Sequence, residues 1–258
     1  MCILKILTLI CLILILNCLL KDNRKHFESK TLHGIPKVIY QVYDKKYLPY
    51  KLRQNRQYIK RLNKGWKYKL YDYNSIKKFI LKEYDKEMLS IYNKINPIYR
   101  AARCDFFRYL LIYKKGGVYL DIKSAMSKPL DKIILEKDTY YLSHWQKKDW
   151  SNKYPPNGEL QQWFIVAPPK HPFLKNVIKK MCERILNKDN KRRGKRGVLY
   201  TTGPFVYTEA INELLPKYRH KIFMDNNELG FIYKNIKGSH TKYFKKHYST
   251  LDDPVILH

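Results

Sequence analysis

This 258-residue sequence contains few glycines and few acidic residues, and few cysteines beyond its amino terminus. Ten glycines are far too few for a collagen. Three of the five cysteines (Cys2, Cys11 and Cys18) lie near the amino terminus, which leaves Cys104 and Cys182 for the rest of the chain. Two cysteines cannot form a disulfide framework or a cysteine-rich zinc module. No asparagine begins an N-x-[ST] sequon, so the sequence gives no sign of N-glycosylation.

The shortage of acidic residues gives a strongly basic chain, with 22 Asp and Glu against 52 Lys and Arg and a net charge of +30. Such a chain either binds nucleic acid or is a soluble domain that attracts anionic substrates and membrane surfaces. The positive charge is spread along the whole sequence, and only residues 191–196 form a tight basic run. Diffuse charge favours a soluble domain that attracts anionic substrates and membrane surfaces, and we expect no nucleic-acid partner. The run at 191–196 is predicted to be a solvated loop.

Long apolar runs are also rare, and the one that exists lies at the amino terminus. Residues 3–20 contain three polar side chains, and no pair of small residues marks a cleavage site. The run therefore favours a retained signal-anchor, a single transmembrane segment at 1–20, over the alternative of a signal-peptide core. A polar stalk at 21–33 and one domain at 34–258 would follow. The orientation stays open, because more positive charges follow the segment than precede it.

Strand and helix patterns alternate along the predicted domain, with no internal repeat. β-Branched and aromatic runs predict strands at 36–43, 66–71, 118–122, 140–145 and 163–167. Helices are predicted at 51–63, from Asn74 or Ser75 to 84, from Pro97 to 115, at 172–187 and at 204–215. This alternation indicates an α/β sandwich with a largely parallel central sheet. Ligands bind such sheets beyond the carboxyl ends of the strands, where Asp121 is expected.

The predicted helix at 98–115 is apolar nearly all round between Cys104 and Tyr113, yet it carries Asp105 and Arg108 on one face. Buried charges are costly unless they are paired or used. One interpretation is an ion pair that holds the helix in place. The other is a functional site, because Gly116-Gly117 leads directly into the strand that ends at Asp121, so the three charged residues would meet.

The string RAARCDFFRYLLIYKKGGVYLDIK at 100–123 resembles the core of the DXD-containing glycosyltransferases of family 32, R-A-x-x-x-D-x-x-R-Y…G-G-x-Y-x-D-x-D. That family includes the yeast-type α-1,6-mannosyltransferases and is akin to the large clostridial glucosylating toxins. Other segments match in the same order, so that the resemblance covers about residues 35–250. They are IPKVIYQVY (35–43), NKGWKYKLYD (63–72), FIVAPPKHPFL (164–174), TGP (202–204) and GSH (238–240).

The resemblance implies a GT-A type, Rossmann-like fold and a membrane-bound enzyme of the endomembrane system. Such an enzyme moves mannose or another hexose from GDP-mannose or a UDP-sugar to a hydroxyl of a glycan, glycolipid or protein. By the same resemblance, Tyr43 lies near the donor base, while Asp105 and Arg108 hold ribose and sugar hydroxyls. Asp121 lies at the sugar and diphosphate, and His240 lies near the metal. The alternative is a degenerate family member that serves as a basic, membrane-anchored binding module.

One departure from the family pattern bears on catalysis: the DXD motif here reads Asp121-Ile122-Lys123. The second aspartate, which binds the divalent metal in relatives, is a lysine. Lys123 could neutralise the donor diphosphate as a fixed cation and act with Asp121 in catalysis. Alternatively, Mn²⁺ or Mg²⁺ could bind through Asp121, His240 and donor oxygens, since such ions often use few protein carboxylates. The third alternative is that catalysis is lost.

Overall fold

A computed structural model describes residues 30–43, 47–145, 158–187, 189–236 and 248–257. Residues Leu32–His258 form one compact unit, separate from Met1–Thr31. The predicted anchor at 1–20, most of the predicted stalk and His240 lie outside the described residues. Within the described ranges, no helix combines the length and apolar character that a membrane crossing requires. The anchor therefore remains a prediction.

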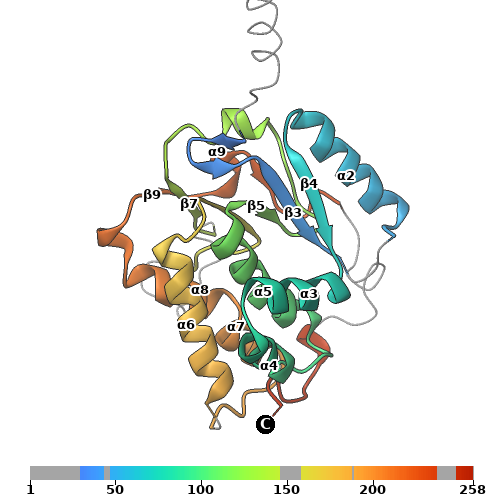
Figure 1. Ribbon diagram of the computed structural model, residues 1–258, viewed down its shortest axis with the longest axis vertical. Coiled ribbons are helices and arrows are strands. Elements are labelled where there is room, and N and C mark those ends of the chain that lie inside the picture. The colour runs from blue at the N-terminus through green and yellow to red at the C-terminus, as the bar shows by residue number, and fades with distance from the viewer. Residues whose placement is uncertain (1–29, 44–46, 146–157, 188, 237–247, 258) are drawn as a thin grey trace, which may run out of the picture. The chain divides into compact units, whose positions relative to one another are not determined.

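A six-stranded sheet crosses the centre of the larger unit (Figure 1). Five of its strands run in one direction, as the sequence predicts, but β8 lies antiparallel between β5 and β7. The sheet is therefore mixed. Its order is β4 (Lys67–Tyr71), β3 (Val38–Val42), β5 (Gly117–Leu120), β8 (Phe164–Ala167), β7 (Tyr140–Ser143) and β9 (His220–Phe223). Two small sheets pair β1 (Thr31–Leu32) with β2 (Ile35–Pro36), and β6 (Ala125–Met126) with β10 (Phe231–Ile232).

Helices pack on both faces of the sheet, and each face has its own apolar core. The strands supply both cores by alternation: Tyr119 of β5 packs against the larger helical layer, whereas Val118 and Leu120 pack with Ile59 on the other face. The larger layer contains α3 (Tyr73–Glu83), α4 (Lys86–Lys94), α5 (Arg100–Lys115), α6 (Pro172–Leu186), α7 (Gly194–Thr201) and α8 (Pro204–Asn212). The other face has α2 (Tyr50–Leu62) and α9 (Asn226–Leu229). Short 3₁₀ turns lie at Leu130–Lys132, Leu215–Lys217 and Tyr248–Thr250.

Two predicted helix starts are wrong, each for a local reason. The side chain of Asp72, and not Asn74 or Ser75, caps α3, because it accepts a hydrogen bond from the Ser75 backbone N–H at 2.8 Å in a reciprocal capping box. Pro97 does not open α5, which begins at Arg100. The residues before it form a turn in which the Asn96 side chain accepts from the Ile98 backbone N–H at 3.2 Å.

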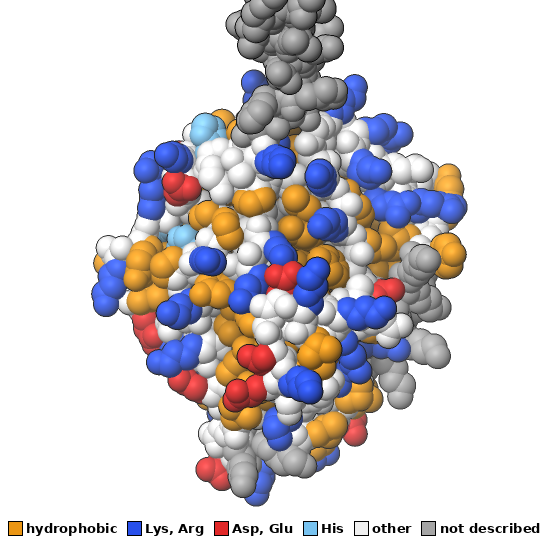
Figure 2. Space-filling model, in the orientation of Figure 1, with side chains coloured by type: hydrophobic (Ala, Val, Ile, Leu, Met, Phe, Trp, Pro, Cys, Tyr) orange, Lys and Arg blue, Asp and Glu red, His pale blue; other side chains and the backbone are white. Residues whose placement is uncertain are grey.

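The basic run at 191–196 is only in part a loop, because α7 begins at Gly194 and includes Lys195 and Arg196. The helix is held there by its apolar side, where Val198 packs into the core. Lysines and arginines elsewhere are scattered over the visible face of the molecule among neutral and apolar side chains (Figure 2). That distribution agrees with the diffuse charge of the sequence.

The helix α5 is buried along one continuous stretch from Asp105 to Ile112, and its exit fixes the position of β5. It ends at Lys115; the capping residue Gly116 has a φ of 62°, and Gly117 follows with a φ of 100°. A Cβ atom on Gly117 would lie 2.8 Å from the Val38 carbonyl oxygen, and one on Gly116 would lie 2.7 Å from Pro169. Only glycine has both the required dihedral angles and the required small size. The chain therefore passes from α5 into β5 without a loop, as expected.

Candidate active site

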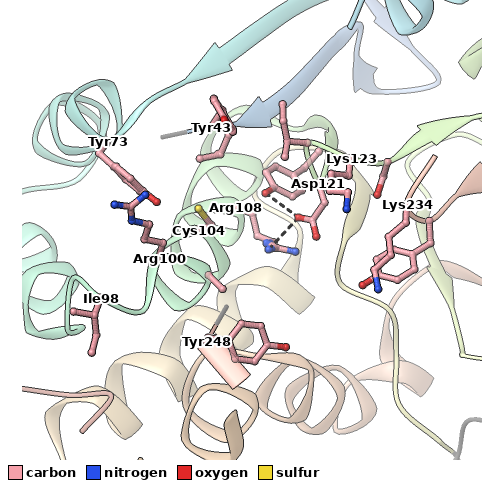
Figure 3. Close-up of a pocket in the computed structure, with 16 residues that line it drawn as sticks. Tyr43, Tyr73, Ile98, Arg100, Cys104, Arg108, Asp121, Lys123, Lys234 and Tyr248 are labelled. Atoms are coloured by element: carbon pink, nitrogen blue, oxygen red, sulfur yellow. Dashed lines mark hydrogen bonds and ion pairs between the residues drawn. The ribbon is translucent and has the colours of Figure 1, made fainter. Parts of the chain in front are cut away.

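A pocket lies at the carboxyl ends of β3 and β5, the edge of the sheet where the sequence predicts Asp121 (Figure 3). The strands and α5 supply most of its lining. The loop after β10 and the turn at Tyr248 close the remaining sides. Lining residues from the strands and the loops that follow them are Val42, Tyr43, Tyr119, Asp121, Ile122, Lys123 and Ser124; those from α3, α5 and the residues before it are Tyr73, Ile98, Arg100, Ala101, Cys104 and Arg108; the remaining ones are Tyr233, Lys234 and Tyr248.

The three charged residues of the predicted site meet at Arg108. Its Nη2 atom donates to Asp105 Oδ1 at 2.7 Å and lies 3.2 Å from Asp121 Oδ1. Its Nη1 atom donates to the backbone carbonyl of Gln162 at 2.7 Å. The Tyr119 hydroxyl donates to Asp121 Oδ1 at 3.2 Å, and the Arg108 guanidinium lies 4.8 Å from the centre of the Tyr119 ring. The ion pair and the convergence on Asp121 are thus parts of one network.

The members of this network differ in their access to the pocket. The side chains of Arg108 and Asp105 are 5% and 6% exposed, whereas that of Asp121 is 36% exposed. Asp105 does not line the pocket, since it lies behind Arg108, and its second carboxylate oxygen accepts from the Thr202 hydroxyl at 3.4 Å. Asp121 is the carboxylate that a ligand can reach. Asp105 reaches a ligand only through Arg108.

Two carboxylates share one guanidinium, and their pKa values reflect this. Burial raises the pKa of Asp105 to about 7, against the opposing effect of Arg108. Burial likewise raises the pKa of Asp121, although Arg108 and Tyr119 partly compensate. Burial alone would lower the pKa of Arg108, but the surrounding carboxylates and Tyr119 raise it well above its ordinary value, so the guanidinium stays charged. The network can therefore take up a proton near neutral pH without losing its central cation.

Lys123 follows Asp121 by two residues and lines the same pocket, with 5% of its surface exposed. Burial lowers its pKa, and the positive charge of Lys234 lowers it further. Asp121 is the single acidic residue among the described lining residues, and the described ranges contain no group of three or more His, Cys, Asp and Glu side chains suited to a metal. The described residues therefore do not fit a divalent cation by themselves. His240 lies outside them.

Tyr43 lines the pocket directly after β3, the strand next to β5. Gln41 of β3 ties the two strand ends together, since its Nε2 atom donates to the Asp121 carbonyl oxygen at 3.0 Å. Among the lining residues, Tyr73 and Arg100 lie on the opposite side of the pocket from Lys123 and Lys234 (Figure 3). Such an arrangement suits an extended ligand with several chemical groups along its length.

The sequence predicts four of the lining residues as site residues: Tyr43, Arg108, Asp121 and Lys123. Among those it does not predict are Tyr233, Lys234 and Tyr248. They come from segments more than 100 residues after α5, and no spacing or motif marks them in the sequence. Cys104, on the contrary, belongs to a recognised motif and lines the pocket as an unbridged thiol; Cys182 is also unbridged.

Residues 49–140 match a protein family described as a glycosyltransferase sugar-binding region containing a DXD motif. The chain is 25% identical over 232 residues to an initiation-specific alpha-1,6-mannosyltransferase of Candida albicans, a match that covers 78% of this chain and 57% of that protein. It is 30% identical over 132 residues to the protein of the same name from Schizosaccharomyces pombe, covering 45% and 32%. The chain thus spans less than two thirds of the length of each of these two relatives.

Among solved structures, the glycosyltransferase PaToxG superposes with a TM-score of 0.51 at 17% identity, over 70% of each chain. This likeness shows a shared α/β fold. The matched family region runs from the start of α2 to the first residue of β7, and it contains Arg108, Asp121 and Lys123. The chain therefore resembles the DXD-containing glycosyltransferases, among them those of the yeast α-1,6-mannosyltransferase type.

Proposed function

We propose that this chain transfers mannose or another hexose from a nucleotide-sugar donor to a hydroxyl of a glycan, glycolipid or protein. The observation that carries the proposal is the accessible Asp121 carboxylate, held by Arg108 and Tyr119 at the carboxyl ends of the strands. Four cationic residues and one acidic residue line the described pocket. Such a pocket favours an anionic ligand, and a nucleotide sugar carries its negative charge on the diphosphate.

Each site residue has a role in this proposal. Asp121 accepts hydrogen bonds from the donor sugar, and Arg108 holds the Asp121 carboxylate in place. Asp105 is a positioning residue that acts through Arg108, because Arg108 lies between Asp105 and the pocket. Tyr43 lies against the donor base. The departing nucleoside diphosphate develops negative charge, which a fixed cation can stabilise. At about 4 Å and an effective dielectric constant of about 20, Lys123 would contribute about 4 kcal/mol per unit charge.

Two further parts of the proposal concern residues outside the described ranges. A divalent cation, Mn²⁺ or Mg²⁺, would need His240 in addition to Asp121. The apolar run at 1–20 would anchor the domain in an endomembrane. Its support is the composition of the run, with three polar residues between positions 3 and 20.

A panel of nucleotide sugars tests the proposed function, with thermal stabilisation and donor hydrolysis measured with and without Mn²⁺. A donor at 100 times its Kd stabilises the folded state by about 2.7 kcal/mol, which raises Tm by roughly 5–10 °C for a domain of this size. We expect GDP-mannose or a UDP-sugar to give this shift and to be hydrolysed. If no nucleotide sugar shifts Tm, the proposal is wrong. A shift without hydrolysis or transfer would favour the binding module instead.

Lys123 allows a second test, because an ammonium repels a divalent cation and attracts a diphosphate. Lys123→Asp is expected to make activity depend more strongly on Mn²⁺ than in the native protein, because it restores the second carboxylate of the motif. The measurement is the ratio of initial rates with Mn²⁺ and with chelator, and Lys64→Asp, at an exposed position outside the pocket, is the control. Native activity that chelation abolishes and Mn²⁺ alone rescues would contradict this role and assign the metal to Asp121 and His240.

A further inference from the structure

Lys234 brings a second ammonium group into the part of the pocket that contains Lys123. It lies in the loop after β10, and both lysines line the pocket on the same side of the Asp121 carboxylate (Figure 3). Both side chains therefore bring positive charge into the same pocket. Placing like charges together costs free energy in the empty pocket. An anionic ligand between them would recover that cost.

A buried asparagine holds the backbone on both sides of Lys123. Asn55 of α2 is 4% exposed, and its Nδ2 atom donates to the carbonyl oxygens of Ser124 at 3.0 Å and of Ile122 at 3.4 Å. Since these are the two neighbours of Lys123 in the chain, the Asn55 amide fixes the turn that carries the lysine.

The same asparagine reaches the loop of Lys234. Its Oδ1 atom accepts from Asn235 Nδ2 at 2.8 Å, and the Ile236 backbone N–H donates to the Lys123 carbonyl oxygen at 3.2 Å. The two lysine loops are therefore tied to each other and to α2. Their spacing is a built feature of the fold, although the lysines are far apart in the sequence.

The backbone of Lys234 shows that its position is imposed by the surroundings. Its φ is 54°, in the left-handed region that side chains other than glycine, asparagine and aspartate rarely adopt. Glycine would be more stable there than lysine if the backbone alone mattered. A lysine kept in such a conformation, followed by two residues that are hydrogen-bonded to Asn55 and to Lys123, is well suited to a role that needs its ammonium group.

We propose that Lys123 and Lys234 together form a two-ammonium site for the diphosphate of the nucleotide donor. The inference rests on the proposed function and adds to it the residue Lys234 and the diphosphate as its ligand. The two lysines supply positive charge from the side of the pocket opposite Tyr73 and Arg100. The site binds a nucleoside diphosphate without a divalent cation and discriminates it from a nucleoside monophosphate, which has no second phosphate to place there.

Calorimetric titration of the full chain with UDP, UMP, GDP and GMP, in the presence of a chelator, tests this site. Lys234→Gly removes the ammonium group and relieves the left-handed backbone, so its Tm should be no lower than that of the native protein. We expect this variant to lose about tenfold or more in affinity for the diphosphate that binds best, because a charged hydrogen bond is removed. Its affinity for the corresponding monophosphate should change less than about threefold. Lys175→Gln, an exposed lysine on α6 outside the pocket, loses the same charge and should bind as the native protein does.

The outcomes separate this inference from the proposed function. If UDP or GDP binds the native chain and Lys234→Gly equally well, the two-ammonium site is wrong and the proposed function stands. The same holds if the native chain binds these diphosphates only after Mn²⁺ is added. If neither these nucleotides nor any nucleotide sugar binds the native chain, with or without Mn²⁺, both proposals are overturned.

Discussion

Asp121→Asn is expected to reduce the rate of sugar transfer by about 100-fold, because hydrogen bonds to a charged acceptor contribute about 1.5–3 kcal/mol each. An asparagine oxygen can still accept from Tyr119 and Arg108, so the variant keeps the local hydrogen bonds while it loses the negative charge that faces the pocket. Initial rates at saturating donor and acceptor measure the effect. Urea unfolding checks that the native fold is retained.

Asp131→Asn is a matched control for this substitution. The Asp131 carboxylate also accepts a hydrogen bond, from Trp66 Nε1 at 2.9 Å, but it lies outside the pocket. Transfer by the control should proceed at the native rate. Equal rates for Asp121→Asn and the native protein would remove Asp121 from the catalytic site.

Arg108→Met is expected to lower the free energy of unfolding by about 3–5 kcal/mol, the usual cost of leaving a buried charge without its partner. Methionine fills a similar volume, so the loss would come from Asp105 and Asp121, which both lose their shared cation. Urea unfolding at pH 8 measures the effect. Lys179→Met, which breaks an exposed pair with Glu183, is the control and should cost less than about 1 kcal/mol.

The size of this loss should depend on pH in a defined direction. The pKa of Asp105 is raised to about 7 by burial, so its contribution to stability is present below pH 4 and is lost as the pH rises through about 7. Without Arg108, the pKa values of both carboxylates rise further, so the variant should be much closer to the native protein at pH 5 than at pH 8. The double variant with Asp105→Asn should recover part of the loss at pH 8. Equal losses at both pH values would contradict a network of buried carboxylates.

The central part of the site could be predicted because its residues lie in one continuous segment. The apolar pattern of α5 indicates a buried helix, and Asp105 and Arg108 stand out on it as charges that need a partner. Gly116-Gly117 and the short apolar strand after them place Asp121 within reach. All of this information is local, and local patterns are what a single sequence expresses best.

Other features depend on contacts between distant segments, which a single sequence does not contain. The residues of β8 alternate between the two cores in either strand direction, so the antiparallel orientation leaves no trace in the pattern. Asn55 resembles any polar residue on a helix surface until its contacts with Ser124 and Asn235 are known. Lys234 is one lysine among many in a chain of this composition.

The glycine turn between α5 and β5 also has a consequence for how the chain can change during evolution. An insertion in α5 would rotate Arg108 by about 100° per residue around the helix axis. An insertion in β5 would turn Asp121 to the opposite face of the sheet, towards the side of Val118 and Leu120. The segment from Arg108 to Asp121 thus tolerates apolar exchanges more readily than any change of length. Insertions that create new specificities are confined to the connections between other elements, where they leave the distance between guanidinium and carboxylate intact.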